Sequence, residues 1–294
     1  MGQLEIRSAA RQSLIIGSGC DLRLKDGQLE IEKDGIKNSF SFDFLETLVL
    51  SSGEISVSTA LLDALMEKHV RVVMIDRSKK PSSVVLPLMG GRSVETRFES
   101  QIAWDCKRKD ALWLRIVENK IRNQSAVLKE NGMTALSTTK SGVSADDCDF
   151  LEAKAAKLYF SRLFGSGFCR RDDANPINAA LNYGYAIILS SVAQDIVALG
   201  YHPFLGIHHH AATNPLNLAS DLMEPFRPTV DRLVKESGVS VFDSVMKKKL
   251  VSVLDCRYSY RGRKQSLQDI ITSYVKDCLS FVSGNSERMP RFDL

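Results

Sequence analysis

Residues 13–42, SLIIGSGCDLRLKDGQLEIEKDGIKNSFSF, alternate apolar and polar side chains around two Asp-Gly dipeptides. A period of two is typical of half-buried β-strands, because successive side chains of a strand point to opposite faces. The pairs Asp26-Gly27 and Asp34-Gly35 tolerate the positive φ angles that tight hairpin turns need. The stretch therefore predicts consecutive strands joined by two hairpin turns.

The rest of the first third continues this β-rich pattern and adds one helix. Residues 47–50, TLVL, and residues 70–76, VRVVMID, have the composition of further strands. Ser58 is a candidate N-cap for a helix over residues 59–68, whose leucines form one stripe. We therefore expect a β-rich N-terminal domain with one helix over residues 1–92.

Beyond Arg92 the sequence changes to long amphipathic segments with helical periodicity, and this change indicates a domain boundary. We expect helices over residues 100–131, 150–165 and 175–200. Residues 133–147 are rich in Ser, Thr, Gly and Asp and are expected to form a loop. Residues 93–294 thus form a mostly α-helical domain, and the fold class is α+β.

Composition limits the functional classes. The net charge of +4 and the pI near 8.7 permit a nucleic-acid partner but would fit many metabolic enzymes equally well. The six cysteines form no CxxC pair, and neither a signal peptide nor a long apolar span is present, so we expect a reduced, cytoplasmic protein without a membrane anchor. Walker, GxGxxG and GxSxG motifs are absent, which argues against nucleotide-binding and serine-hydrolase functions.

Residues 201–231, YHPFLGIHHHAATNPLNLASDLMEPFRPTVD, contain a candidate metal site. Three consecutive histidines are followed by Asp221 and Glu224 on an apolar run. Imidazole and carboxylate groups together suit Mn, Zn or Mg-like ions. Pro225 should end or kink the helix that carries both acids, which still share a face at i and i+3.

Glu152 is the candidate third ligand. In the predicted helix over residues 150–165 it falls on the same stripe as apolar residues such as Tyr159 and Leu163. Burial of an unpaired carboxylate would cost several kcal/mol, so a buried Glu152 needs a neighbouring cation or a hydrogen-bond network. The alternative is that Glu152 lies in the first helical turn, interacts with the helix N-terminus and stays in water.

Two further groups of polar residues are candidates for binding. A basic cluster interleaved with tyrosines is the best candidate for tracking phosphates, the alternative being a solvated helix face. Its members are Lys247, Lys248, Lys249, Arg257, Arg261, Arg263 and Lys264. In the predicted helix over residues 175–200, polar residues could border an active site or be core residues with local partners. These residues are Asn178, Asn182, Tyr183 and Tyr185.

Taken together, the motifs resemble the CRISPR-associated adaptation integrase family, in the subfamily that accompanies the large single-protein effector nucleases. The resemblance covers nearly the whole chain. It is carried by SSGEISVSTALLDALMEKHVRVVMID, NKIRNQS, EAKAAKLYFSRLFG, NPINAALNYGYAIILS, GIHHHAATNPLNLASDLMEPFRPTVD and a tail ending MPRF.

This resemblance implies a β-sandwich-like N-terminal domain, a helical catalytic domain and a divalent metal, Mg²⁺ or Mn²⁺, bound by Glu152, His209 and Glu224. The family's spacing after the glycine selects His209 from the histidine triplet, with His208 and Asp221 as supporting or alternate ligands. Family members usually have Gly after the metal-binding glutamate, where this chain has Ala153.

The resemblance also implies an activity and partners. The 3′-hydroxyl of an incoming prespacer would attack the junction of leader and repeat in a CRISPR array, a transesterification that serves antiviral defence and has DNA cleavage as a related activity. The implied partners are double-stranded and branched DNA, a second copy of the chain, a small ferredoxin-fold adaptation protein and an effector nuclease complex. Two other functions fit the residues alone: a noncatalytic DNA-binding scaffold, and a metal hydrolase of a small substrate.

Overall fold

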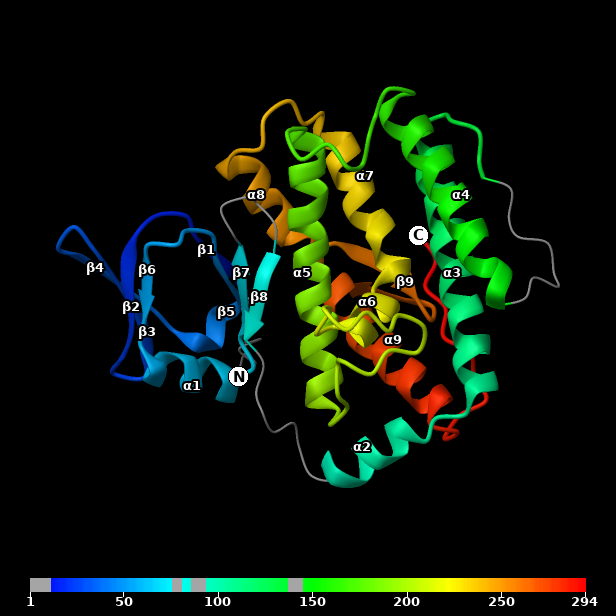
Figure 1. The fold of residues 1–294 in the computed structure, drawn as a ribbon. Coiled ribbons are helices and arrows are strands. Elements are labelled where there is room, and N and C mark those ends of the chain that lie inside the picture. Colours follow the sequence, from blue (N-terminus) through cyan, green and yellow to red (C-terminus); the bar gives the residue numbers. More distant parts are fainter. Residues whose placement is uncertain (1–11, 76–80, 86–93, 137–144) are drawn as a thin grey trace, which may run out of the picture. The chain divides into compact units, whose positions relative to one another are not determined.

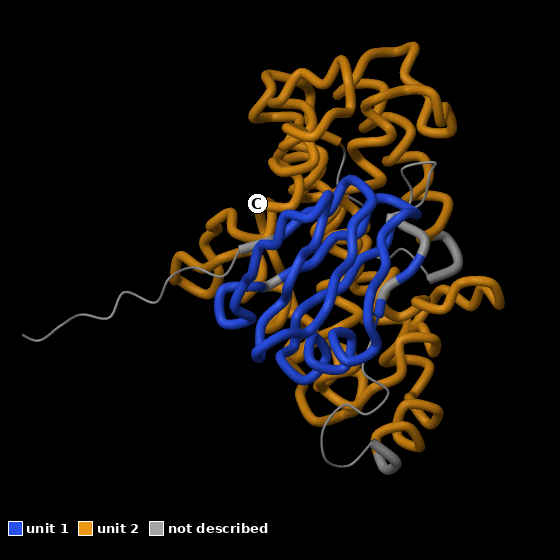
Figure 2. Tube along the Cα trace, turned by 90° about the vertical axis from the view of Figure 1, so that its left-hand side faces the viewer, with its two compact units in different colours: residues 1–87 blue, residues 88–294 orange. Residues whose placement is uncertain are grey.

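The computed structural model describes residues 12–75, 81–85, 94–136 and 145–294. The chain divides into two compact units, residues 1–87 and residues 88–294, shown in different colours in Figure 2. The expected boundary between residues 92 and 93 lies outside the described residues. In the described ranges, no helix is long and apolar enough to span a lipid bilayer.

The described residues of the first unit form two four-stranded sheets and one α-helix (Figure 1). The first sheet has the order β1 (Gln12–Ile16), β5 (Leu45–Leu50), β7 (Arg71–Ile75) and β8 (Pro81–Val85), and its first three strands are parallel. The second has the order β4 (Ile36–Phe40), β3 (Gln28–Lys33), β2 (Cys20–Lys25) and β6 (Ile55–Val57). Between β5 and β7 the chain forms β6 and helix α1 (Thr59–Glu67).

The two predicted hairpins are confirmed. Strands β2, β3 and β4 pair antiparallel, with Leu22 opposite Ile31. Asp26 and Gly27 have φ angles of 50° and 71°, so both central residues of the turn adopt the left-handed conformation that Asp-Gly tolerates. The predicted cap of α1 is also confirmed, because Ser58 Oγ accepts a hydrogen bond from Leu61 N at 3.3 Å.

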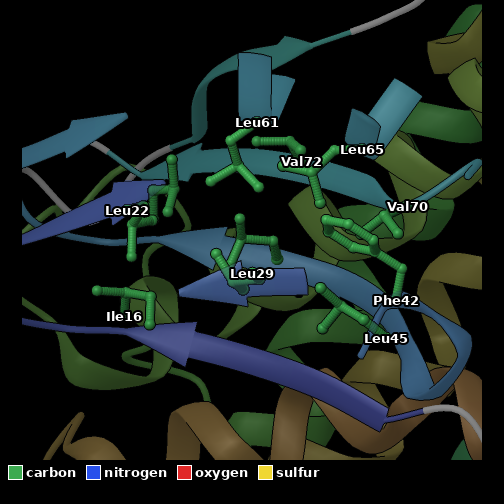
Figure 3. Close-up of a cluster of buried hydrophobic side chains, with 11 residues drawn as sticks. Ile16, Leu22, Leu29, Phe42, Leu45, Leu61, Leu65, Val70 and Val72 are labelled. Carbon is green, nitrogen blue, oxygen red and sulfur yellow. The ribbon is translucent and has the colours of Figure 1, made fainter. Parts of the chain in front are cut away.

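Both sheets and α1 contribute side chains to one apolar core (Figure 3). Leu22 and Leu29 from the second sheet, Val72 from the first, and Leu61 and Leu65 from α1 are all fully buried. A core shared between the inner faces of two sheets is what a β-sandwich-like unit requires.

The second unit is mainly helical, and its described part includes a short hairpin (Figure 1). Its helices are α2 (Val94–Ile102), α3 (Cys106–Glu130), α4 (Ala145–Phe164), α5 (Pro176–Ala198), α6 (Asn217–Leu222), α7 (Arg227–Ser237), α8 (Ser244–Val251) and α9 (Leu267–Val282). The 3-10 turns η1 (Phe42–Phe44, in the first unit), η2 (Glu224–Phe226) and η3 (Ser252–Asp255), and the strands β9 (Arg257–Tyr260) and β10 (Arg263–Ser266), complete the structure. The expected α+β fold is confirmed.

Helix α5 packs against α7 and α8 at a glycine. A Cβ atom at Gly184 would lie 2.4 Å from Val230 Cγ1 of α7 and 3.1 Å from Leu250 Cδ2 of α8. The absent side chain therefore sets how closely α7 approaches α5, and α7 follows directly on the segment that carries Glu224.

Three local predictions need correction or restriction. A single helix over residues 100–131 is wrong, because α2 and α3 are separated at Asp105, whose Oδ1 accepts a hydrogen bond from Arg108 N at 3.0 Å and caps α3. The predicted loop over residues 133–147 falls largely outside the described residues, but its last residues belong to α4. Since α4 begins at Ala145, Glu152 lies beyond the first turn, and the helix-N-terminus alternative for this carboxylate is wrong.

Candidate metal centre

Asp221 organises the histidine loop. Its side chain is fully buried, and its Oδ2 accepts hydrogen bonds from the backbone amides of Ile207 at 2.8 Å and His208 at 3.1 Å. Its Oδ1 accepts from His209 N at 3.2 Å and lies 2.5 Å from His209 Nδ1. Three backbone amides and the His209 ring thus contact this carboxylate, so Asp221 holds the histidine loop in place.

The imidazole of His209 is oriented by this contact. Its Nδ1 faces Asp221, so in the neutral tautomer that donates to Asp221 the Nε2 atom carries the lone pair. A metal-binding histidine usually donates a hydrogen bond to a carboxylate from the ring nitrogen that does not bind the metal. The hydrogen bond to Asp221 raises the pKa of His209 against the effect of burial, and the nearby charges of Glu224 and Glu152 raise the pKa further.

The other two histidines lie in different surroundings. The ring of His208 stacks on that of Trp113, with centroids 4.2 Å apart, and its Nε2 lies 2.9 Å from Asp149 Oδ1. Trp113 also meets His209 edge-on, at 5.5 Å between centroids. His210 is exposed and lines a cavity of about 410 Å³ together with Phe204 and Lys109. The structure therefore separates the roles of the three imidazoles.

Glu152 and Glu224 meet at one ammonium group. Lys120 Nζ lies 2.5 Å from Glu152 Oε1 and 2.5 Å from Glu224 Oε2. The second oxygen of Glu224 accepts a hydrogen bond from Arg227 Nε at 2.8 Å. Lys120 and Glu224 are buried, at 8% and 4% exposed, so these contacts are shielded from water.

Charge pairing governs the ionisation of this cluster. Burial alone would raise the pKa of Glu224, but the positive charges of Arg227 and Lys120 outweigh it and lower the pKa to about 2. Burial would lower the pKa of Lys120, yet the carboxylates of Glu224 and Glu152 raise it above its usual value. Glu224 and Lys120 are therefore both ionised at neutral pH.

The donor set fits a divalent metal. Across the described residues, no group of three or more His, Cys, Asp or Glu side chains already surrounds a metal-sized space. Instead, carboxylate oxygens from α4 and η2 converge on the cationic Lys120 ammonium, which occupies the position of a positive charge between them. Oxygen ligands of this kind suit Mg²⁺ and Mn²⁺, and the imidazole of His209 would add a nitrogen ligand that Mn²⁺ accepts more readily.

A second polar network adjoins the cluster through Arg227. The guanidinium of Arg227 lies over the ring of Tyr185, 4.6 Å from its centroid, and Arg170 lies over the same ring at 5.5 Å. The Tyr185 hydroxyl donates to the buried carboxylate of Asp231. Burial raises the pKa of Asp231 to about 6, although Tyr185, Tyr159 and the two arginines act in the opposite direction.

Of the four expected border residues, Tyr185 lies nearest the cluster. Asn178 and Asn182 both accept hydrogen bonds from Arg170, at 3.0 Å and 2.8 Å, and thus contact the guanidinium that lies over the Tyr185 ring. Tyr183 instead packs against Phe242, with ring centroids 5.5 Å apart.

The seven basic residues divide into two patches. One lies on α8, where Lys248 and Lys249 are exposed; the other lies on the β9–β10 hairpin. Figure 1 shows α8 and β9 apart, with α5 and α7 between them in that view. Arg261 at the hairpin turn pairs with Asp277, whereas Arg263 and Lys264 are exposed on β10.

Sequence reasoning missed Lys120, Arg227 and Trp113. A signal for Lys120 was present, because it falls on the helical stripe of buried α3 residues that includes Trp113, Ile116 and Val117. A lysine on such a stripe needs an anionic partner, as Glu152 on its own stripe needs a cation. The two requirements together predict the ion pair.

Solved structures share this fold. A casposase bound to integration product superposes with a TM-score of 0.80 at 20% identity, covering 95% of this chain and 92% of that chain. A Cas6-RT-Cas1–Cas2 complex matches with a TM-score of 0.76 at 17% identity, over 99% of this chain and 37% of that chain.

Sequence comparison gives the family. The CRISPR-associated endonuclease Cas1 of Neisseria meningitidis serogroup C (strain 8013) is 35% identical over 227 residues, which is 76% of this chain and 74% of the relative. The family model described as CRISPR associated protein Cas1 matches residues 14–238, a range that includes Glu152, His209 and Glu224. The chain therefore belongs to the Cas1 family of CRISPR-associated endonucleases.

Proposed function

We propose that this chain joins the 3′-hydroxyl of a prespacer to a CRISPR repeat by metal-dependent transesterification, with Glu152, His209 and Glu224 as the metal ligands. The observation that carries the proposal is the convergence of two carboxylates from α4 and η2 on one cationic group. The imidazole of His209 lies near enough to both carboxylates for their charges to raise its pKa.

A bound Mg²⁺ or Mn²⁺ would supply charge neutralisation at the scissile phosphate and orient the attacking oxygen. The protein residues prepare the site for that ion. Asp221 fixes the His209 ring and Arg227 holds one oxygen of Glu224, which leaves the other oxygen directed toward Lys120 and Glu152. The nucleophile is a DNA hydroxyl, so no protein nucleophile is required.

The charge balance of the cluster explains why its substrate would be an anion. The formal charges of Glu152 and Glu224 cancel those of Lys120 and Arg227. A divalent ion would therefore give the site an excess of two positive charges, which phosphodiester groups can neutralise. We expect DNA and metal to strengthen each other's binding, as linkage requires.

The chain's partners and location extend this proposal. Residues 1–92 would serve dimerisation and residues 93–294 catalysis, with a small ferredoxin-fold protein between two dimers. The solved Cas6-RT-Cas1–Cas2 complex supports such a partner, because the Cas1-containing chain there shares this fold. Placement in the subfamily that accompanies large effector nucleases rests on the sequence motifs, as does contact with an effector complex. Because the proposed substrate is a CRISPR repeat in the cell's own DNA, we expect a cytoplasmic location.

The two basic patches would bind DNA backbone. On the β9–β10 hairpin Arg257, Arg263 and Lys264 are exposed, and Tyr258 lies among them. Such residues neutralise phosphates without reading sequence. The casposase bound to integration product, which shares this fold, supports a DNA-binding role.

The test is a joining assay. The purified protein and its small partner are incubated with prespacer DNA and a supercoiled plasmid carrying the repeat, with and without Mn²⁺. We expect covalent joining only with the metal, and its loss in Glu152→Gln and in Glu224→Gln. Binding of branched DNA without any metal-dependent joining would indicate a noncatalytic scaffold and overturn the proposal. Activity that is insensitive to salt in a protein without DNA affinity would instead indicate a small-substrate hydrolase.

A further inference from the structure

The last residues of the chain, residues 289–294 (MPRFDL), form a segment that we name the C-terminal strap. Its Phe292 is fully buried, although the flanking Arg291 and Asp293 are exposed. The Phe292 ring lies 4.9 Å from that of Phe226 in η2 and 5.8 Å from that of Tyr258 in β9, measured between centroids. One strap side chain therefore packs between two segments of the second unit.

Two buried asparagines of α3 bind the strap backbone. Asn119 pairs with Phe292 in both directions, because Phe292 N donates to Asn119 Oδ1 at 2.8 Å and Asn119 Nδ2 donates to Phe292 O. Asn123 Nδ2 donates to the same carbonyl at 3.0 Å, and Leu294 N donates to Asn123 Oδ1 at 3.1 Å. Both asparagines are fully buried, so each lost partner would leave a buried polar group unsatisfied.

The strap also reaches the metal-binding segment. Asn123 Nδ2, which binds Phe292 O, donates to Pro225 O at 2.9 Å as well. Pro225 and Phe226 directly follow Glu224, and these three residues make up η2. Strap and α3 thus hold η2 from two sides, by an amide bridge to Pro225 and by ring packing on Phe226.

The same turn of α3 carries Lys120, whose ammonium binds the Glu224 carboxylate. Main chain and side chain of the Glu224 segment are therefore fixed by neighbouring residues of one helix. A short 3-10 turn between α6 and α7 has few hydrogen bonds of its own, and such segments depend on tertiary contacts.

We propose that the C-terminal strap is a positioning element for the metal centre, in which Phe292 holds η2 so that Glu224 faces Glu152 and His209. This inference rests on the proposed metal-binding role of Glu224. It assigns no contact with DNA or metal to the strap itself. Phe292 acts through Phe226 and, by way of Asn123, through Pro225.

The experiment compares the full chain with a chain ended at Arg288, alone and with a synthetic MPRFDL peptide added. Two quantities are measured: the dissociation constant for Mn²⁺ by calorimetry, and amide hydrogen exchange over residues 223–227. We expect truncation to speed exchange in this segment and to weaken Mn²⁺ binding by about 10- to 100-fold, the usual effect of removing outer-shell support. The peptide should restore both, and a peptide with Ala in place of Phe292 should restore neither.

Matched variants keep the inference testable if the truncated chain does not fold. In the full chain, Phe292→Leu retains apolar bulk and should show a smaller shift in the same direction, while Arg291→Ala and Asp293→Ala, at exposed strap positions, should change neither quantity. If the truncated chain folds and matches the full chain in both quantities, the inference is overturned. If the truncated chain does not fold, Phe292→Leu decides instead: a match between this variant and the full chain in both quantities overturns the inference. A third result is that the full chain binds no Mn²⁺, while truncation still speeds amide hydrogen exchange over residues 223–227. This result would support the strap's effect on η2 and overturn the proposed metal centre instead.

Discussion

Lys120 Nζ lies 2.5 Å from Glu224 Oε2, and both residues are buried. The same ammonium is 2.5 Å from Glu152 Oε1, so one lysine pairs with two carboxylates that come from different elements. This arrangement pairs both carboxylates without a metal, and in the proposed metal centre it would place a competing cation among the ligands.

Replacement of Lys120 by methionine should expose both effects. Without metal, both carboxylates lose their shared counter-charge, and breaking the buried Lys120–Glu224 pair should lower the free energy of unfolding by roughly 3–5 kcal/mol. Addition of Mn²⁺ should raise the melting temperature of Lys120→Met more than that of the parent. Lys107→Met, at an exposed position on the same helix, serves as the control. Equal shifts on Mn²⁺ addition in parent and Lys120→Met would contradict the idea of competition.

The three histidines should respond differently to alanine substitution. His209→Ala should reduce joining by more than the roughly 10–100-fold that is typical of outer-shell residues. His208→Ala removes the stacking on Trp113 and the contact with Asp149, so a smaller loss is expected. His210→Ala should be close to the parent. Joining rates at saturating Mn²⁺ measure the order, and similar losses in all three variants would refute the assignment to His209.

Stability should depend on pH through Asp231. Its pKa is about 6 in the folded protein and ordinarily 3.8, so the folded state retains a proton that the unfolded state has lost between these values. The stabilising contribution is present at low pH and is lost as the pH rises through 6. Relative to the parent, Asp231→Asn should therefore gain roughly 1 kcal/mol between pH 5 and pH 8. Urea unfolding at both pH values measures this, and a pH-independent difference would exclude Asp231 as the cause.

Gly184→Ala tests the close approach of α5 and α7. A new methyl group would lie 2.4 Å from Val230 Cγ1, and overpacking of this kind costs typically about 1–3 kcal/mol. The gain in helix propensity offsets at most about 1 kcal/mol. We expect a lower melting temperature for Gly184→Ala, whereas Gly167→Ala has open space around the new Cβ and should be tolerated. A melting temperature at or above that of the parent would show that α7 can shift without cost.

If the basic patches bind DNA, substitutions in them should change how DNA affinity depends on salt concentration. Combined Arg263→Ala and Lys264→Ala substitutions should weaken DNA binding at low salt and reduce the slope of log affinity against log salt by about one for each lost phosphate contact. The α8 variant Lys248→Ala with Lys249→Ala tests the second patch separately. Lys68→Ala in the first unit, also exposed, is the control. An unchanged slope in a patch variant would remove that patch from the DNA surface.

Local chemistry made part of the fold predictable. The Asp-Gly pairs determined both hairpins, because their backbone preference needs no tertiary partner. Pro225 predicted the helix break between α6 and α7 for the same reason. The interruption of α2 and α3 at Asp105 was missed, although an aspartate is a common N-cap, since the apolar pattern continues across it.

The site depends more on contacts between distant segments. The apolar stripe around Glu152 correctly indicated a partly buried carboxylate that needs a cation. The identity of that cation, Lys120, follows from the packing of α3 against α4, which periodicity alone does not supply. The same holds for Asp221, whose i+3 spacing to Glu224 suggested a shared role, whereas its oxygens bind the backbone of the histidine loop.

Asp221 also decides how the histidine triplet can evolve. Three consecutive histidines suggest redundancy, in which one imidazole could replace another. To bring His208 or His210 to the place of His209, however, the loop would have to slide by one residue, about 3.8 Å, and break the hydrogen bonds that three backbone amides donate to Asp221. The repeat therefore provides no redundancy: sequence drift at His210 should be harmless, while a lost His209 has no substitute within the loop.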